Sequence, residues 1–262
     1  MSSGFVRVES PEDGIRVITV DRAEKLNALN SAVIEELSSA TAAAEADTAL
    51  RCVVFTGAGE KAFIAGADVA ELAKLTPIEG REHSRRGQAL LDRIERLPVP
   101  TIAAINGYAY GGGLELAMAC TIRVASENAR MGLPETSLGI IPGYGGTQRL
   151  ARHVGGARAL ELVLTSEKGL TAAEAERIGL VNRVVPVGQA LPAAIEIARK
   201  IRANGAAACR FALEAIRRGL DVPLAEGQVL EATLFGLCAA TEDMKEGMNA
   251  FLEKRPAKFT GR

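Results

Sequence analysis

Two glutamates stand alone in apolar, glycine-rich stretches, which is an unusual setting for an ionisable side chain. Glu115 lies in GYAYGGGLELAMAC (107–120), where three glycines precede an apolar segment. Glu135 follows twenty positions later, in MGLPETSLGIIPGYGGTQRL (131–150). Apolar surroundings raise the pKa of a carboxyl group, and a second carboxyl close by raises it further. Such a pair would share about one proton near neutral pH, which suits proton transfer.

Each acid also has an ordinary structural explanation. The glycines could simply permit close packing, and Glu115 could complement the dipole in the first turn of a helix that begins near Gly112 or Gly113. Glu135 follows Pro134 and could be an acid at a helix N-terminus. Either residue alone favours this explanation, but two such acids, each beside a glycine-rich bend, favour chemistry.

Two backbone N–H groups could complete a site around these acids. The junction between the glycines and the helix exposes the N–H of Gly112, with the positive end of the helix dipole behind it. In AFIAGADVAEL (62–72) a strand ends and a helix begins near Asp68, which could be an ordinary N-cap. The N–H of Ala67 is then a second exposed donor, and an oxyanion hole requires two converging donors from separate segments.

Several other chemistries have little support in the sequence. The patterns GxGxxG, GxxxxGK[ST] and GxSxG do not occur, which argues against a nucleotide fold and a serine-hydrolase elbow. The two histidines, His83 and His153, lie in charged helical contexts, and we expect both at the surface. No catalytic triad or multi-histidine metal site is therefore expected. The four cysteines are scattered, and we expect core thiols in a reducing compartment.

The charge and hydropathy of the chain limit the classes of partner that it could bind. The 262-residue chain has a net charge of -1 and a pI near 6.2, so no global field draws in nucleic acid or anionic lipid. The basic stripe at 81–96 could bind RNA, but its interleaved acids favour a solvated amphipathic helix. No apolar run reaches the roughly 18 residues of a membrane span, and the N-terminus lacks a leader pattern. We therefore expect a cytoplasmic protein.

The order of predicted elements indicates an α/β fold. Two alternating strands, 4–10 and 14–22, precede a helix at 31–46. The same rhythm recurs in a strand at 51–59 with the segment 62–75, and in a strand at 100–110 with a helix at 113–120, followed by strands at 121–126 and 129–134. This pattern predicts a stacked spiral of sheets with helices outside.

The chain becomes purely helical after about Pro186. The pattern predicts helices at 189–204, 206–220 and 223–240. We divide the chain into a spiral core at 1–186, which contains the site, and an integral helical subdomain at 187–262. Such large helices need their own core or another subunit to pack against.

Three stretches together resemble the enoyl-CoA hydratase/isomerase (crotonase) family, most closely its true hydratases. They are AFIAGADV, INGYAYGGGLELAMACTIRVASENARMGLPETSLGIIPGYGGTQRL and TEDMKEGMNAFLEKRPAKF. The resemblance extends from about Phe5 to the C-terminus. It implies a crotonase-like spiral of ββα units, with C-terminal helices that assemble homotrimers or, as stacked trimers, homohexamers.

The resemblance also implies an activity, the hydration of trans-2-enoyl-CoA to 3-hydroxyacyl-CoA in fatty-acid β-oxidation or related metabolism. No metal or separate cofactor is implied, because coenzyme A is part of the substrate. The N–H groups of Ala67 and Gly112 would hold the thioester oxygen. Glu115 would orient and activate water, and Glu135 would deliver the α-proton. Many relatives with other reactions lack one or both acids, so their joint presence favours hydration.

The resemblance further implies where coenzyme A binds. Its segments are 24–30 and 65–69, with the substrate-binding candidates Lys25, Leu26, Ala28, Ala65, Asp68 and Val69. Gly143, in PGYGG (142–146), would wall the site near the water. Lys254 or Arg255 of the tail could reach the nucleotide phosphates of a neighbouring subunit. Enoyl-CoA isomerisation or another acyl-CoA lyase reaction remains an alternative, as does an RNA-binding or assembly role.

Overall fold

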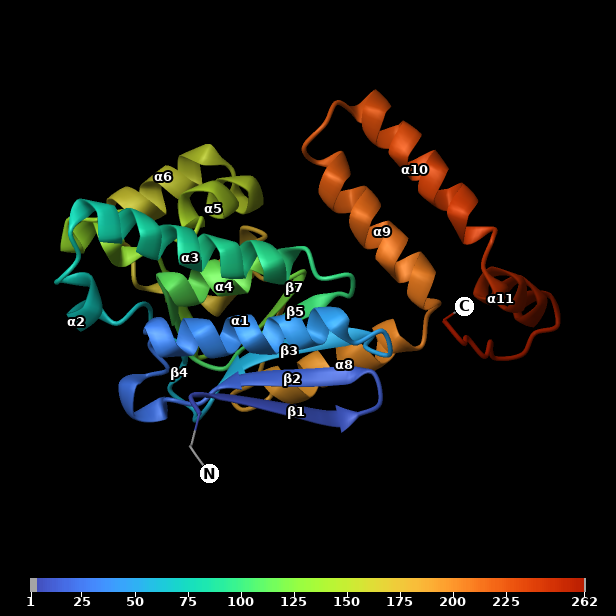
Figure 1. The fold of residues 1–262 in the computed structure, drawn as a ribbon, viewed down its shortest axis with the longest axis horizontal. Coiled ribbons are helices and arrows are strands. Elements are labelled where there is room, and N and C mark those ends of the chain that lie inside the picture. The colour runs from blue at the N-terminus through green and yellow to red at the C-terminus, as the bar shows by residue number, and fades with distance from the viewer. Residues whose placement is uncertain (1–3, 262) are drawn as a thin grey trace.

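Two sheets form the centre of the computed structural model, which describes residues 4–261 (Figure 1). The larger sheet has the order β1-β2-β3-β5-β7-β10, and all its neighbours are parallel except β1 and β2. Its strands are β1 (Val6–Glu12), β2 (Ile15–Val20), β3 (Cys52–Gly57), β5 (Thr101–Ile105), β7 (Ile122–Ser126) and β10 (Arg183–Val185).

The smaller sheet has the order β4-β6-β8-β9, in which only β9 is antiparallel to its neighbour. Its strands are β4 (Ala62–Ile64), β6 (Tyr108–Tyr110), β8 (Arg130–Gly132) and β9 (Leu170–Thr171). From β3 to β8 the chain alternates between the larger and the smaller sheet, and a helix follows most such pairs. This alternation is the predicted ββα spiral, so the predicted fold class is confirmed.

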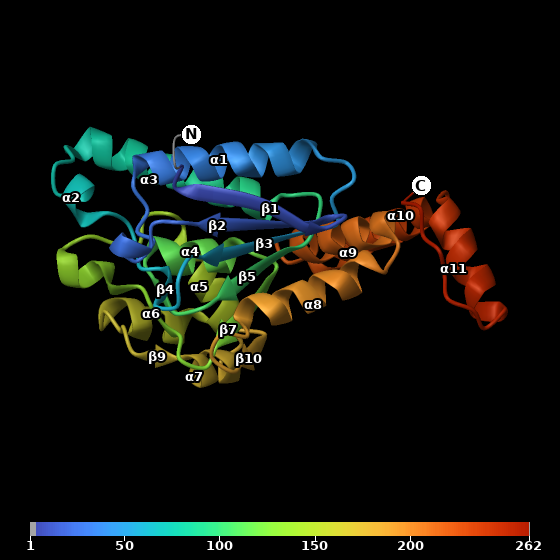
Figure 2. The same ribbon diagram turned by 90° about the horizontal axis from the view of Figure 1, so that it is seen from below.

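Helices cover both faces of the larger sheet because its strands are apolar on both faces. In β3, Val53 and Phe55 pack in one cluster with α1 (Ser31–Ala46), α3 (Pro77–Glu95) and α4 (Gly112–Ala119). Cys52 and Val54 point to the opposite face, as alternate residues of a strand must. There Ala190, Ala194 and Ala198, one turn apart on α8 (Ala190–Arg202), pack against the sheet (Figure 2).

The last three helices extend away from this body (Figures 1 and 2). They are α9 (Ala206–Gly219), α10 (Leu224–Cys238) and α11 (Glu242–Leu252). Large apolar side chains on them face solvent, with Phe235 76% and Phe251 81% exposed. The remaining short elements are η1 (Ala23–Lys25), α2 (Val69–Leu72), η2 (Pro134–Leu138), α5 (Gly146–Val154), α6 (Gly156–Leu164) and α7 (Ala172–Arg177).

The predicted surface positions of both histidines are wrong. His83 lies on the inner stripe of α3 with Gly87, Leu90, Leu91 and Ile94, and only 7% of it is exposed. His153 is half-buried, and burial lowers its pKa to about 4. A charged sequence context does not specify which face of a helix a residue occupies, because that depends on what packs against it.

The predicted core thiols are confirmed for two of the four cysteines. Cys52 and Cys120 are buried, whereas Cys209 and Cys238 are half-buried on α9 and α10. Residues 1–3 and 262, which include the outermost residues of the two predicted regions, lie outside the described part of the chain.

A truncation series tests whether α8 belongs with the spiral core. A chain that ends at residue 186 should be insoluble or unfolded, because it leaves one apolar face of the larger sheet uncovered. A chain that ends at residue 204 keeps α8 and should remain soluble and cooperatively folded, as followed by circular dichroism during thermal unfolding. Cooperative unfolding of the shorter chain, or insolubility of both, would contradict this account.

Candidate active site

Glu115 lies in the first turn of α4, a helix that is buried along its whole length. Its side chain is 1% exposed. Its Oε1 accepts hydrogen bonds from the backbone N–H of Tyr144 at 2.8 Å and of Gly146 at 2.6 Å. The loop before α5 therefore satisfies a carboxyl group that would otherwise be very costly to bury.

Glycines let the backbone and the two acids approach one another at the start of α4. Gly111 has a φ of +49°, which favours glycine. A Cβ on Gly111 would lie 2.6 Å from Oε1 of Glu135. A Cβ on Gly113 would lie 2.0 Å from the backbone oxygen of Ile64, so α4 packs directly on β4. Both positions exclude any larger residue.

Glu135 extends from η2 toward the start of α4. It follows Pro134 in the first turn of that short helix, so the structural explanation of its position also holds. Its Oε2 is buried and has no hydrogen-bond partner among residues 4–261. An unpartnered buried carboxyl oxygen is costly and commonly marks a site where a ligand or water binds. The two predicted acids thus flank the start of α4.

The surroundings move both carboxyl pKa values toward neutrality. Burial raises the pKa of Glu115 to about 8, and the charge of Glu135 adds to the rise. The two backbone hydrogen bonds and Arg149 oppose this rise. Burial also raises the pKa of Glu135 to about 7. Both groups can therefore gain or lose a proton near neutral pH.

The backbone N–H groups of Ala67 and Gly112 are among those near the acids that have no acceptor within the described residues. Ala67 pairs with Leu29 in an isolated parallel bridge, in which Leu29 bonds to the backbone oxygen of Gly66 and to the N–H of Asp68. This pattern turns the N–H of Ala67 to the other side. A Cβ on Gly111 would lie 3.7 Å from the Cα of Gly66, so the two backbones are adjacent.

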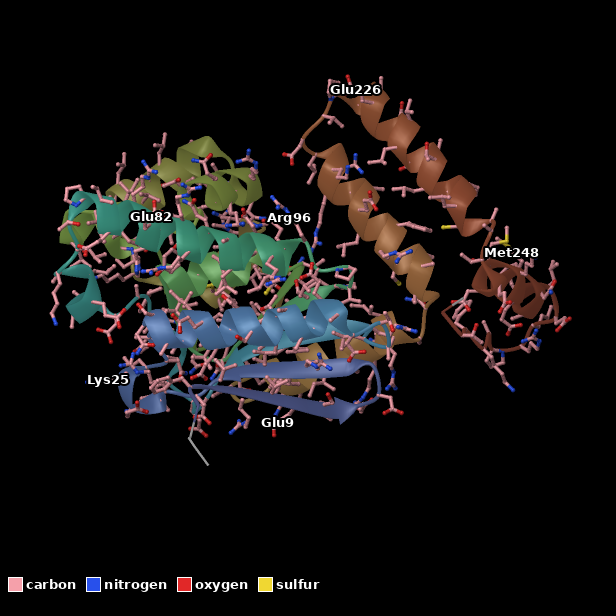
Figure 3. All side chains as sticks on the ribbon, in the orientation of Figure 1. Glu9, Lys25, Glu82, Arg96, Glu226 and Met248 are labelled. Carbon is pink, nitrogen blue, oxygen red and sulfur yellow. The ribbon has the colours of Figure 1, made fainter. Side chains whose placement is uncertain are left out.

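The segments predicted for coenzyme A also come together. The N–H of Ala65 donates to the backbone oxygen of Leu26, which has a φ of +51°. Asp68 caps α2, as the ordinary interpretation predicted, and also forms an ion pair with Arg22 at 3.1 Å. The guanidinium of Arg22 donates to the backbone oxygen of Ala28 as well. Lys25 and Val69 are both exposed. Lys25 lies far from Met248 of α11 (Figure 3).

Gly143 lies where α3 holds the loop before α5. Its backbone oxygen accepts hydrogen bonds from Ser84 Oγ at 2.5 Å and from Gln88 Nε2 at 3.0 Å. The outer face of α3 is solvated, as Glu82 and Arg96 illustrate (Figure 3). The amphipathic helix expected at 81–96 is thus present, and its inner face positions the site.

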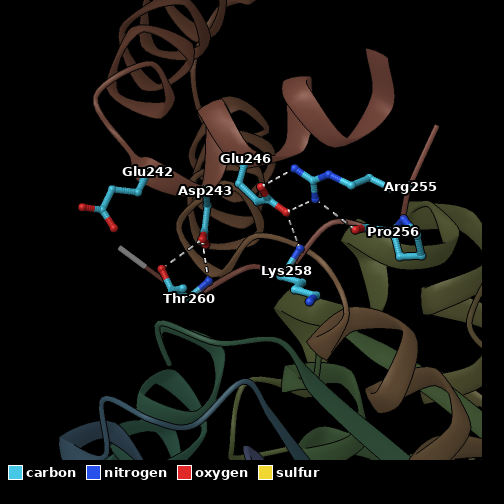
Figure 4. A pocket seen from close by; sticks show the side chains of 7 residues that line it. All are labelled: Glu242, Asp243, Glu246, Arg255, Pro256, Lys258 and Thr260. Carbon is cyan, nitrogen blue, oxygen red and sulfur yellow. Dashed lines mark hydrogen bonds and ion pairs between the residues drawn. The ribbon is translucent and has the colours of Figure 1, made fainter. Parts of the chain in front are cut away.

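Of the two tail residues proposed for phosphate binding, Arg255 is already paired within the chain. Arg255 forms ion pairs with Glu246 at 2.7 Å and Glu253 at 2.6 Å, beside a pocket at the C-terminal end (Figure 4). The hydrogen bond from Arg255 is the main cause that lowers the pKa of Glu246 to about 2. Lys254 adopts a φ of +54° at the end of α11. Within one chain α11, which these residues follow, lies far from α4 (Figure 1).

Sequence reasoning missed the residues that hold the site together. Asn27 is fully buried with a φ of +59°, and its amide donates to the backbone oxygens of Ala58 and Ala62. Arg149 forms ion pairs with Asp92 and Glu95 of α3 and donates to the backbone oxygen of Tyr144. The phenol of Tyr144 and the imidazole of His83 form a further buried hydrogen bond. Such long-range partners leave no signal in local spacing.

Among residues 4–261, no group of three or more His, Cys, Asp or Glu side chains is arranged to hold a metal ion. In the same part of the chain, every helix is too short or too polar to cross a bilayer.

The raised pKa of Glu115 predicts a pH-dependent stability. The folded chain binds this proton more tightly than the unfolded chain, so its contribution to stability is full below about pH 4.5 and is lost as pH rises toward 8. Glu115→Gln cannot ionise. It should exceed the wild type in unfolding free energy by about 5 kcal/mol at pH 9, but by less than about 1 kcal/mol at pH 5.

Urea unfolding at equal protein concentration across this pH range measures the difference. Glu161→Gln, which changes an exposed glutamate of α6, is the matched control and should give a flat difference. A Glu115→Gln advantage that does not grow with pH would show that Glu115 ionises as an ordinary surface carboxyl does.

Sequence comparison identifies relatives over nearly the whole chain. The short-chain-enoyl-CoA hydratase of Clostridium acetobutylicum is 46% identical over 93% of this chain and 93% of its own length. The crotonyl-CoA hydratase of Syntrophomonas wolfei is 45% identical over 95% of each chain.

Structural comparison agrees. The crystal structure of an enoyl-CoA hydratase from Bacillus anthracis superposes with a TM-score of 0.95 at 43% identity, covering 98% of this chain and 100% of that chain. The model of the family described as enoyl-CoA hydratase/isomerase matches residues 10–262. The chain therefore belongs to the enoyl-CoA hydratase/isomerase family.

Proposed function

We propose that the protein adds water to trans-2-enoyl-CoA thioesters and releases 3-hydroxyacyl-CoA. The observation that carries this proposal is the buried pair of Glu115 and Glu135 at the start of α4, with both carboxyl pKa values raised toward neutrality. Relatives named for the hydration of short-chain enoyl-CoA and of crotonyl-CoA support the same reaction.

The N–H groups of Ala67 and Gly112 would bind the thioester oxygen. Negative charge accumulates on this oxygen when water attacks the β-carbon, and two free donors from adjacent backbones suit that charge. The loss of one such donor costs roughly 2.7–4 kcal/mol in other enzymes, so the pair would supply a large share of the catalysis.

The two carboxyls would carry the protons. In the protonation state that reacts, Glu115 is ionised and Glu135 holds the proton that the pair shares. Glu115 then accepts a proton from the water as the water oxygen bonds to the β-carbon, and Glu135 donates its proton to the α-carbon. The fixed Oε1 of Glu115, held by two N–H groups, supports its role in orienting the water. Gly143 would wall this end of the site.

Coenzyme A would lie along the two segments joined at Leu26 and Ala65, with Ala28, Asp68 and Val69 beside it. The exposed Lys25 would bind its phosphates. The reaction needs neither a metal nor a separate cofactor, because the acids and the N–H groups supply proton transfer and charge stabilisation.

Other reactions of the family are the alternative. Isomerisation of an enoyl-CoA, or another acyl-CoA lyase reaction, needs the same oxyanion donors but a different use of acids. The presence of two raised-pKa carboxyls favours hydration. RNA binding has weaker support, because arginines on the outer face of α3 pair with acids, as Arg93 does with Glu45.

We propose further that the protein assembles as a trimer or a hexamer through its last helices, in the region 187–262. The exposed apolar side chains of α10 and α11, such as Phe235 and Phe251, are more than a subdomain leaves in water without a partner. Four free cysteines, two of them buried, support a cytoplasmic setting, in fatty-acid β-oxidation or related metabolism.

The roles of the acids predict a specific loss of activity. Glu115→Gln and Glu135→Gln should each lower kcat for the hydration of crotonyl-CoA by about 100-fold or more, because each removes one proton transfer. The loss of the conjugated absorbance measures the rate. Glu161→Gln on the exposed face of α6 is the control. A wild-type rate in either site variant would contradict the proton-transfer role assigned to that glutamate.

The exposed tail predicts the oligomeric state. Sedimentation at micromolar concentration should give a particle of three or six chains. Phe235→Asp should shift it toward smaller species, because it would place a charge in the proposed interface, where the exposed Phe235 would be buried. Val8→Asp, at an exposed apolar position on β1, should not. A stable wild-type monomer would contradict the proposed assembly.

A further inference from the structure

The ring of Tyr144 fills the space between α3 and the start of α4. A Cβ on Gly87 of α3 would lie 2.1 Å from Cδ1 of this ring. A Cβ on Gly112 would lie 3.3 Å from Cδ2 and Cε2 on its other edge. Only 4% of Tyr144 is exposed. The ring is therefore seated between two glycines, one of which carries a proposed donor of the oxyanion hole.

Tyr144 is fixed at both ends. Its phenol oxygen is 2.5 Å from Nε2 of His83. Its backbone N–H donates to Oε1 of Glu115 at 2.8 Å, and its backbone oxygen accepts from Arg149 Nη1 at 3.0 Å. Because Gly87 already touches the ring, α3 leaves no room for the ring to swing outward.

The position of this ring bears on the length of the acyl chain. A bound substrate would have its thioester oxygen at Gly112 and its β-carbon beside Glu115. The Tyr144 ring lies against Gly112, and its backbone N–H donates to Glu115. The acyl carbons beyond the β-carbon need space next to the acids, and the ring occupies space on that side. A rigid ring at this position limits the length of the acyl chain that the site can hold.

We propose that Tyr144, held by His83, closes the acyl end of the site and restricts the enzyme to short 2-enoyl-CoA thioesters. This inference rests on the proposed function. It assigns to Tyr144 and its positioning residue His83 a role in specificity, distinct from the proton transfers of the two glutamates. The face of the ring is apolar, which suits a short alkyl chain.

His83 suits this role because it brings no charge to the apolar pocket. Burial lowers its pKa, and Arg86 lowers it further against the opposing effect of Glu71. A neutral imidazole can hold the phenol as either donor or acceptor, according to its tautomer. The pair thus fixes the ring without an ionised group.

The test compares kcat/KM for crotonyl-CoA with kcat/KM for 2-octenoyl-CoA, which is four carbons longer. The wild type should favour the shorter substrate. Tyr144→Ala should raise the ratio of octenoyl to crotonyl kcat/KM by about tenfold or more, because the removed ring opens space beside Gly112. Tyr108→Ala, which removes an exposed tyrosine of β6, is the matched control and should leave the ratio unchanged.

Tyr144→Leu keeps an apolar side chain in the core and serves if the alanine variant unfolds. It should raise the same ratio to a smaller extent. An equal fall in kcat/KM at both lengths would overturn the inference, because it would show that Tyr144 only supports the fold. Equal wild-type use of both substrates would overturn it as well. A wild type that hydrates neither substrate would instead refute the proposed function.

Discussion

The burial of one carboxyl group, that of Glu115, shapes the surrounding structure. A carboxyl that is 1% exposed is tolerated only where hydrogen bonds replace water, and Tyr144 and Gly146 supply two of them to a single oxygen. Those donors belong to a loop that α3 holds through Ser84 and Gln88. The loop before α5 and helix α3, both distant in sequence from Glu115, thus offset the free-energy cost of burying this carboxyl group. They also fix the orientation of its side chain.

The same arrangement explains why glycines crowd the start of α4. Gly111 and Gly113 bring the helix against Glu135 and β4 at distances that no side chain would allow. The backbones of Gly66 and Gly111 are adjacent, so the N–H groups of Ala67 and Gly112 come from neighbouring segments. One set of close contacts thus produces both the desolvated carboxyls and the free donors that the proposed hydration requires.

Much of this could be predicted from sequence where the signal is local. The helix at 31–46 was predicted with its observed bounds, because its composition and periodicity determine it. Asp68 was predicted as a cap, and its ion pair with Arg22 was not, because that partner is 46 residues away. His83 was wrongly expected at the surface, and Tyr144 was read only as part of a bend. Their burial depends on the packing of α3 against α4, which no local pattern specifies.

We propose that Glu115 and Glu135 exchange protons near neutrality because both are desolvated. Infrared difference spectra of the wild type against Glu115→Gln and Glu135→Gln, recorded from pH 4 to 9, observe the protonated carboxyl of each residue directly. This proposal predicts protonated-carboxyl bands from the pair at pH 6 that disappear only as pH rises through about 7 to 8, because burial raises the pKa of both groups. Loss of both bands near the ordinary glutamate pKa, at about pH 4.3, would contradict it.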